Sequence, residues 1–319
     1  MAEIGRNHFQ LVARFMRKGT LVPFLGAGVN LCDRAPESEF LLGRDLPSGR
    51  ELASLLASEF FYPTEGALDL LRVSQYVSVK AGDGSLYNQL HEVFDRNFVP
   101  TTPLQFLAGV PAILRQQGEP RYQVILTTNY DDSLERAFQA VDEPYDVVSY
   151  ICEGDNRGKC RHVAPDGTST VIHRPNEYDR VSPADRTVIV KLHGAIDRLD
   201  QREDSYVITE DDYIDFLATG TEIADLLPTE VAAKVNGTTH FLFLGYGLRD
   251  WNLRVILRRI WGAQVLKEIS WAVLDQIDDI DREWWRRWGP MEIHEVPLGE
   301  YIPRLQEVLA EPVTPQAVP

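Results

Sequence analysis

The chain has 319 residues, of which 44% are hydrophobic and 25% are charged, which is ordinary for a globular protein and excludes the composition of a disordered chain. The formal net charge of −16 argues against broad binding to phosphate backbones, because such binding needs clustered lysine and arginine. We therefore expect a folded core without direct nucleic-acid binding.

The first half of the chain alternates amphipathic helices with two short apolar strands. A helix is predicted over residues 8–18, and a buried strand over 20–25 ends in a glycine turn. Residues 40–118 are interpreted as a mainly helical insertion. Its helices are predicted at 49–61, 67–81, 85–96 and 103–117. A second buried strand is predicted at 122–126, and a helix follows to about residue 140.

The second half begins with residues 141–186, which are rich in Pro, Gly, Asp and Arg and are predicted to form surface loops and short strands. Three further buried strands are predicted at 187–191, 240–244 and 269–274. Helices at 250–261 and 278–288 are expected to complete the core.

Short apolar strands that alternate with helices predict an α/β fold, namely a Rossmann-like parallel sheet covered by helices on both faces. Residues 1–311 are expected to form a single domain, and residues 312–319 a disordered tail. Ligands of such sheets bind at the carboxyl ends of the strands. The unusual glycine-rich and polar turns of this chain follow the predicted strands, so we expect them to meet at one edge.

The first of these turns is Gly26-Ala27-Gly28, which is followed by Asn30. Its small residues would let backbone N–H groups approach a diphosphate. The third glycine of the dinucleotide fingerprint is missing, because position 31 is Leu31. Taken alone, the motif is equally well interpreted as a tight turn between a strand and a helix.

The second turn is Thr128-Asn129-Tyr130-Asp131. The Asn129 amide can both donate and accept hydrogen bonds, which suits holding a ribose hydroxyl or an attacking water. Capping of the following helix by Asn129 or Asp131 is an equally good interpretation.

The third turn is His193-Gly194, where the imidazole is expected to emerge at the sheet edge with little steric cover. A histidine there can act as a general base near neutral pH. A lone histidine is more often a structural residue, and that interpretation is taken for the other six. These are His8, His91, His162, His173, His240 and His294.

Taken in order, the motifs FLGAGVN, TTNYD, KLHG and FLGYGLRDWNLR resemble the sirtuin-like (SIR2-like domain) family over about residues 18–290. In that family a Gly-Ala-Gly turn, an Asn-x-Asp motif and a His-Gly pair are the defining marks. Two departures separate the chain from the protein deacylases of the family. Cys32, Cys152 and Cys160 cannot supply the paired cysteines of a zinc module, and NLCDRAPESEF replaces the deacylase stretch Gly-Ile-Pro-Asp-Phe-Arg. Both departures favour the branch that is similar to NAD⁺ hydrolases of prokaryotic antiviral defence.

The resemblance implies cleavage of the substrate NAD⁺ to nicotinamide and ADP-ribose. It implies that His193 is the general base, that Asn129 positions water and ribose, and that Asp131 steadies the nicotinamide side. The expected NAD⁺-binding residues are Gly26, Ala27, Gly28, Asn30, Thr128, Gly194, Gly245, Tyr246 and Asp275. No metal is expected, because nicotinamide is already a cationic leaving group in NAD⁺.

Other functions stay open at this point. The chain could be an NAD⁺-dependent deacylase, an ADP-ribosyltransferase, or a module that senses NAD⁺ or ADP-ribose without turnover. The presence of both Asn129 and His193 argues against pure sensing, because a binder has no need of a base.

Because unrestrained NAD⁺ depletion is toxic, as in abortive infection, we expect gating by homo-oligomerisation or by a separately encoded partner. The resemblance suggests a DNA-translocating ATPase or a short Argonaute, and no fused sensor domain is expected. Candidate interface aromatics are Phe60, Phe61, Tyr62, Trp251 and Trp261, for which packing within the chain is an equally good interpretation. No apolar run approaches the roughly 20 residues that span a bilayer, and the N-terminus lacks the apolar core of a secretory signal, so a cytoplasmic location is expected.

Overall fold

The computed structural model describes residues 4–35, 38–63, 68–119, 121–218, 223–235, 239–246, 257, 267–287 and 289–312. The predicted helix at 250–261 lies outside the described residues apart from Leu257, and the predicted tail lies outside them beyond Pro312.

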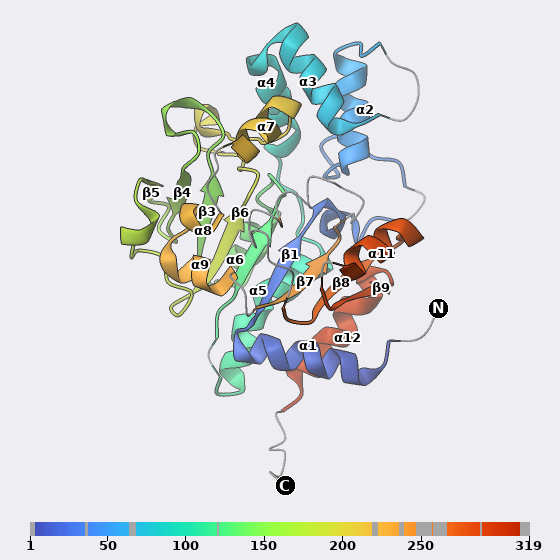
Figure 1. Ribbon diagram of the computed structural model, residues 1–319, viewed down its shortest axis with the longest axis vertical. Coiled ribbons are helices and arrows are strands. Elements are labelled where there is room, and N and C mark those ends of the chain that lie inside the picture. The colour runs from blue at the N-terminus through green and yellow to red at the C-terminus, as the bar shows by residue number, and fades with distance from the viewer. Residues whose placement is uncertain are drawn as a thin grey trace.

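The centre of the molecule is a nine-stranded sheet in the order β5-β4-β3-β6-β2-β1-β7-β8-β9 (Figure 1). The strands are β1 Leu21–Leu25, β2 Val124–Thr127, β3 Tyr145–Tyr150, β4 Cys160–Val163, β5 Ser169–Ile172, β6 Thr187–Lys191, β7 His240–Leu244, β8 Ser270–Leu274 and β9 Met291–Glu295. All neighbouring strands pair in parallel except at the β5-β4-β3 edge, which is antiparallel. The predicted α/β fold with a mainly parallel, Rossmann-like sheet is confirmed.

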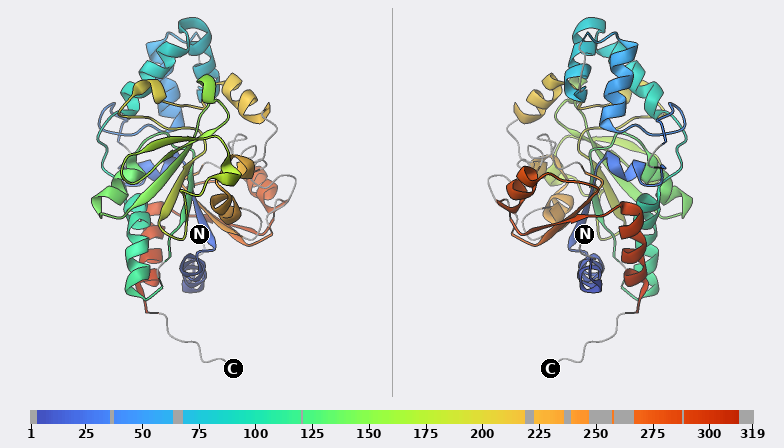
Figure 2. Two further views of the ribbon diagram at one scale, coloured as in Figure 1. Left: turned by 90° about the vertical axis from the view of Figure 1, so that its left-hand side faces the viewer. Right: turned by 90° about the vertical axis from the view of Figure 1, so that its right-hand side faces the viewer.

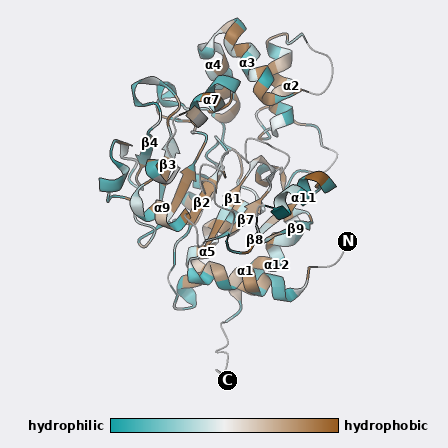
Figure 3. Cartoon of the chain, in the orientation of Figure 1, coloured by the Kyte–Doolittle hydropathy of each residue, from teal (hydrophilic) through white to brown (hydrophobic). Residues whose placement is uncertain are grey.

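Successive residues of the central strands enter two different hydrophobic cores. In β1, Leu21 and Leu25 pack on one side of the sheet, whereas Val22 and Phe24 pack on the other. This alternation explains why the central strands are apolar at every position, since both faces of the sheet are buried. Figure 3 shows hydrophobic residues concentrated in these strands.

Helices cover both faces of the sheet (Figure 2). One core is closed by α1 Arg6–Lys18, α5 Thr102–Gln116, α6 Ser133–Ala140 and α12 Leu298–Ala310. The other is closed by α7 Glu210–Ala218, α8 Ile223–Leu226, α9 Thr229–Val235 and α11 Asp279–Arg287. No helix among the described residues is long and apolar enough to cross a membrane.

Three helices form a separate layer at one end of the molecule, with a hydrophobic core of their own (Figure 1). They are α2 Gly49–Glu59, α3 Leu70–Ala81 and α4 Asp83–Phe94. The helix α2 begins at a capping box, in which Ser48 Oγ accepts from Glu51 N–H at 3.2 Å and Ser48 N–H donates to Glu51 Oε2 at 2.7 Å. The helix α5, which the sequence analysis grouped with this insertion, packs on the sheet instead.

The structure adds three elements that the sequence analysis did not identify as part of the core. The strand β3 lies within the stretch predicted to be at the surface, yet it is buried between β6 and β4. The strand β9 and the helix α12 extend the core beyond the predicted last helix, which is α11 here. β9 has Glu, His and Glu at three of its five positions, because an edge strand meets solvent on part of its surface.

Candidate active site

A cavity of about 400 Å³ opens where β1, β2, β6 and β7 end. Its floor consists of residues one or two positions after the ends of these strands, among them Gly26, Thr128, His193 and Gly245. The cavity lies at the reversal of strand order, because β2 and β6 lie on one side of β1 and β7 lies on the other. Open α/β sheets bind ligands at this point.

The roof of the cavity comes from the helical insertion. Residues of the α2 region and the ends of the other two helices line it, namely Leu46, Pro47, Ser48, Gly49, Leu52, Leu70 and Phe94. The site is therefore enclosed by two layers that are far apart in the sequence, with polar strand ends below and mainly apolar side chains above.

The structure brings the predicted site residues together, with two exceptions. Those that line the cavity are Gly26, Ala27, Gly28, Asn30, Thr128, Asn129, Asp131, His193, Gly245 and Tyr246. Gly194 does not line it and has a structural reason to be glycine: at its φ of +83°, a Cβ atom would lie 2.2 Å from the Ser205 carbonyl oxygen. Asp275 is exposed after β8 and is also absent from the lining.

Glycine is required after β1 and β7 because the backbones of the two turns are in direct contact. Gly28 N–H donates to the Gly245 carbonyl at 2.8 Å, and Gly26 N–H donates to the Leu244 carbonyl at 3.1 Å. A Cβ on Gly28 would lie 2.5 Å from the Gly245 oxygen, and one on Gly245, whose φ is +63°, would lie 2.3 Å from Val29 N. These N–H groups are thus occupied within the protein, and the turn is tight while still lining the cavity.

The second turn is held by several hydrogen bonds. Asp131 accepts from Asn30 Nδ2 at 2.9 Å and from Ser133 N–H at 3.0 Å, so each carboxylate oxygen has a donor. The bond from Ser133 spans two residues and precedes α6, whose N-cap residue is Asp132, so neither Asn129 nor Asp131 is the N-cap of this helix. The Asn129 amide donates to the Gly26 carbonyl at 3.3 Å, and its Oδ1 has no protein donor among the described residues. That oxygen is available to a ligand.

His193 is buried rather than exposed, with only 3% of its surface accessible. Tyr213 and Phe216 of α7 pack edge-on against its ring, so the expectation of little steric cover was wrong. Its Nδ1 lies 3.3 Å from the Tyr213 hydroxyl, and its buried Nε2 has no hydrogen-bond partner in the described part of the chain. Burial lowers the pKa of His193 to about 3, so the imidazole is neutral near pH 7. One ring nitrogen can therefore accept a proton.

A buried lysine that was not among the predicted site residues lies beneath the second turn. Lys191 ends β6 with 2% of its surface accessible, and its Nζ donates to the Asp131 carbonyl at 2.5 Å and to Glu135 Oε1 at 2.7 Å. Burial raises the pKa of Glu135, and the nearby Lys191 opposes that rise. The signal was visible in the sequence, because a lysine closes the otherwise apolar strand TVIVK.

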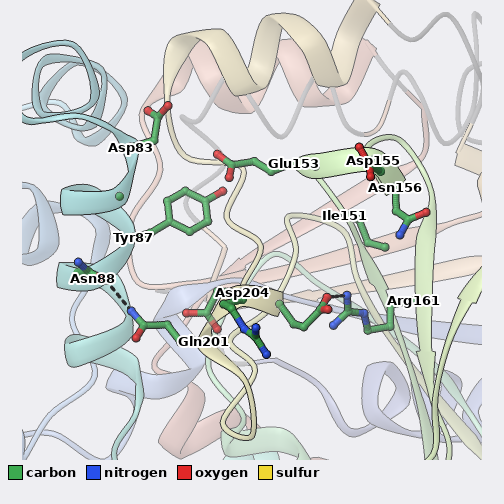
Figure 4. Close-up of a pocket in the computed structure, with 14 residues that line it drawn as sticks. Asp83, Tyr87, Asn88, Ile151, Glu153, Asp155, Asn156, Arg161, Gln201 and Asp204 are labelled. Carbon is green, nitrogen blue, oxygen red and sulfur yellow. Dashed lines mark hydrogen bonds and ion pairs between the residues drawn. The ribbon is translucent and has the colours of Figure 1, made fainter.

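A second, larger cavity of about 600 Å³ lies between α4 and the turn that follows β3 (Figure 4). Carboxylates outnumber cations in its lining, with Asp83, Glu153, Asp155, Glu203 and Asp204 against Arg161 and Arg202. Arg161 is already paired with Asp197 and Glu203. Such a cavity repels a diphosphate, and it contains none of the predicted residues. The smaller cavity at the strand ends is therefore the candidate active site.

Comparison with known proteins identifies the family of the chain. The family model of the SIR2-like domain matches residues 123–290. Defense-associated sirtuin 2 of Bacillus subtilis is 24% identical over 258 residues, which is 79% of this chain and 20% of that protein. NAD(+) hydrolase ThsA of Acinetobacter baumannii (strain 532279) is 26% identical over 223 residues, which is 68% of this chain and 37% of that protein. The chain thus spans well under two thirds of either relative. Because the family match covers more than half of the 319 residues, the chain belongs to the SIR2-like domain family.

Proposed function

We propose that the protein is an NAD⁺ glycohydrolase that cleaves NAD⁺ to nicotinamide and ADP-ribose. The observation that carries the proposal is His193, whose buried Nε2 has no partner in the described structure and which lines the same cavity as Asn129. One relative is named an NAD(+) hydrolase and another a defense-associated sirtuin, which supports a role as an NAD⁺-depleting effector of antiviral defence.

In the proposed reaction, NAD⁺ lies across the strand ends with its diphosphate near Gly26-Ala27-Gly28. The bond between ribose C1′ and the nicotinamide nitrogen breaks, and the electron pair leaves with nicotinamide. Because the ring nitrogen is cationic in NAD⁺, the leaving group becomes neutral without being protonated and without a metal. The ribose gains oxocarbenium character, and water adds at C1′.

The chain's own residues act on this water. Asn129 Oδ1 accepts a hydrogen bond from the water or from a ribose hydroxyl, and His193 Nε2 takes the proton that the water loses. A weak base suffices, because the water becomes strongly acidic as it bonds to the electron-poor carbon. Asp131 acts through Asn30, which it holds beside the glycine turn.

The test is nicotinamide release from NAD⁺ by the purified protein, alone and with its activator, in the presence and absence of an acylated peptide. We expect equimolar nicotinamide and ADP-ribose without any peptide. Strict dependence on the peptide would identify a deacylase. NAD⁺ binding without release under every condition would identify a sensing module.

We further propose that activity is gated by homo-oligomerisation or by a separately encoded partner, such as a DNA-translocating ATPase or a short Argonaute. NAD⁺ is a cofactor that many enzymes share, so a hydrolase that is active at all times depletes the cell of it.

A further inference from the structure

Two histidines and a glutamate meet outside the candidate active site. His8 lies in the first turns of α1, and Glu292 and His294 lie two residues apart on β9, on the same side of that strand. One donor atom of each residue lies within 4.8 Å of the other two. None of the three lines either large cavity.

The nitrogen atoms that face this cluster lack partners. His8 Nδ1 and His294 Nε2 are both buried, and neither has a hydrogen-bond partner among the residues the structure describes. The two rings are close, with centroids 4.2 Å apart. Buried polar atoms without partners cost free energy, so this pair calls for an occupant that satisfies both nitrogens at once.

Neighbouring side chains orient the donor atoms of the cluster for binding a cation. His8 Nε2 lies 2.8 Å from the buried Tyr301 hydroxyl, so Nε2 can carry the proton and leave a lone pair on Nδ1. Trp271 Nε1 donates to Glu292 Oε2 at 3.0 Å and orients that carboxylate. Metal-binding histidines and carboxylates are usually held in this way by groups behind them.

We propose that His8, Glu292 and His294 bind one divalent transition-metal ion of the zinc class. Two imidazole nitrogens and a carboxylate oxygen suit Zn²⁺, which leaves a fourth position for water. Two ligands on a tetrahedral zinc lie roughly 3.3 Å apart, so small side-chain rotations would bring the three donors to the ion. The Glu292 side chain is 52% exposed, which gives the ion a path from solvent.

The ion would join the N-terminal helix to the edge strand β9. Through Tyr301 it would also be coupled to α12, which packs beside α1 (Figure 1). Its role is structural, and it takes no part in NAD⁺ cleavage, for which no metal is expected.

The experiment uses the full chain after treatment with a chelator, titrated with Co²⁺ and with Zn²⁺. We expect one equivalent of Co²⁺ per chain with visible d–d absorption, and a melting temperature that rises by roughly 3–6 °C in saturating Zn²⁺. Glu292→Gln keeps an acceptor for Trp271 and should weaken metal binding at least about tenfold. His294→Ala should abolish it, and His173→Ala, at an exposed histidine elsewhere, should leave it unchanged.

Two results would overturn the proposal. One is the absence of saturable metal binding and of any thermal shift, which would make a buried water the partner of both imidazoles. The other is unchanged stoichiometry in both Glu292→Gln and His294→Ala, which would place the ion elsewhere. Neither readout depends on NAD⁺ turnover, so failure here is distinguishable from failure of the proposed hydrolase activity.

Discussion

His193 and Asn129 carry the proposed chemistry, and their substitution tests it directly. We expect His193→Ala and Asn129→Ala each to lower the rate of nicotinamide release by about 10²–10⁴-fold, because a positioned base or its oriented water is lost. The exposed His173→Ala is the matched control and should keep full activity. Circular dichroism and thermal melts would verify folding. A folded His193 variant with near wild-type turnover would remove this residue from the mechanism.

The low pKa of His193 leads to a second prediction, which concerns the pH dependence of stability. An unfolded histidine has a pKa near 6.5 and binds a proton as the pH falls below it, whereas folded His193, with a pKa of about 3, does not. Its burial therefore costs stability progressively from pH 6.5 downward and nothing above. Between pH 7 and pH 5 the wild type should lose about 2 kcal/mol more unfolding free energy than His193→Gln. Urea titrations at the two pH values measure this, and equal losses would mean that the ring is protonated in the fold.

The same burial sets the expected pH profile of the reaction. Because the folded imidazole remains unprotonated well below neutrality, the acid limb of kcat/KM should lie below about pH 5. An acid limb centred near pH 6.5 would indicate a solvated base instead.

At the scale of elements, the contact between the turns after β1 and β7 can be tested by adding one methyl group. Gly245→Ala combines a φ of +63° with a Cβ 2.3 Å from Val29 N, so we expect a loss of roughly 2–4 kcal/mol. Gly118→Ala is the matched control: its φ is +75°, but a Cβ would meet nothing within 4 Å. It should cost about 1 kcal/mol. Equal losses in urea unfolding would show that the two turns are not in tight contact.

Elements with a clear local pattern of residues were predictable from the sequence. The strands β1, β6 and β7 are runs of apolar residues, and each precedes one of the unusual turns, so the sheet and most residues of the candidate site followed from them. The burial of the strand β3 was not predicted, because its flanking loops dominate the local composition. The cover of His193 by Tyr213 was not predicted, because it depends on contact between α7 and the turn after β6, which no local pattern encodes.

At the scale of the whole molecule, the prediction concerns assembly. Phe61 is 86% exposed at the end of α2, whereas Phe60 and Tyr62 pack against the core of the insertion; Trp251 and Trp261 lie outside the described residues. We expect the protein to elute above its monomer mass and Phe61→Ser to shift it toward monomer, since exposed aromatics are enriched in interfaces. Val141→Ser, at the end of α6, serves as the exposed apolar control. A purely monomeric protein with full activity and no partner in light scattering would refute the gating proposal and leave the catalytic residues untouched.

The two layers of the cavity differ in how much change of sequence they can accept. The floor is backbone locked against backbone, as at Gly28 and Gly245, and tolerates almost no change. The roof is side chains of α2 and its neighbours, such as Leu52 and Leu70, which can be exchanged without disturbing the sheet. In the proposed hydrolase, the residues that act on the bond thus lie in the floor, and the residues that select the nucleotide lie in the roof. A chimera that carries the insertion of another family member should keep the chemistry and acquire a new substrate preference.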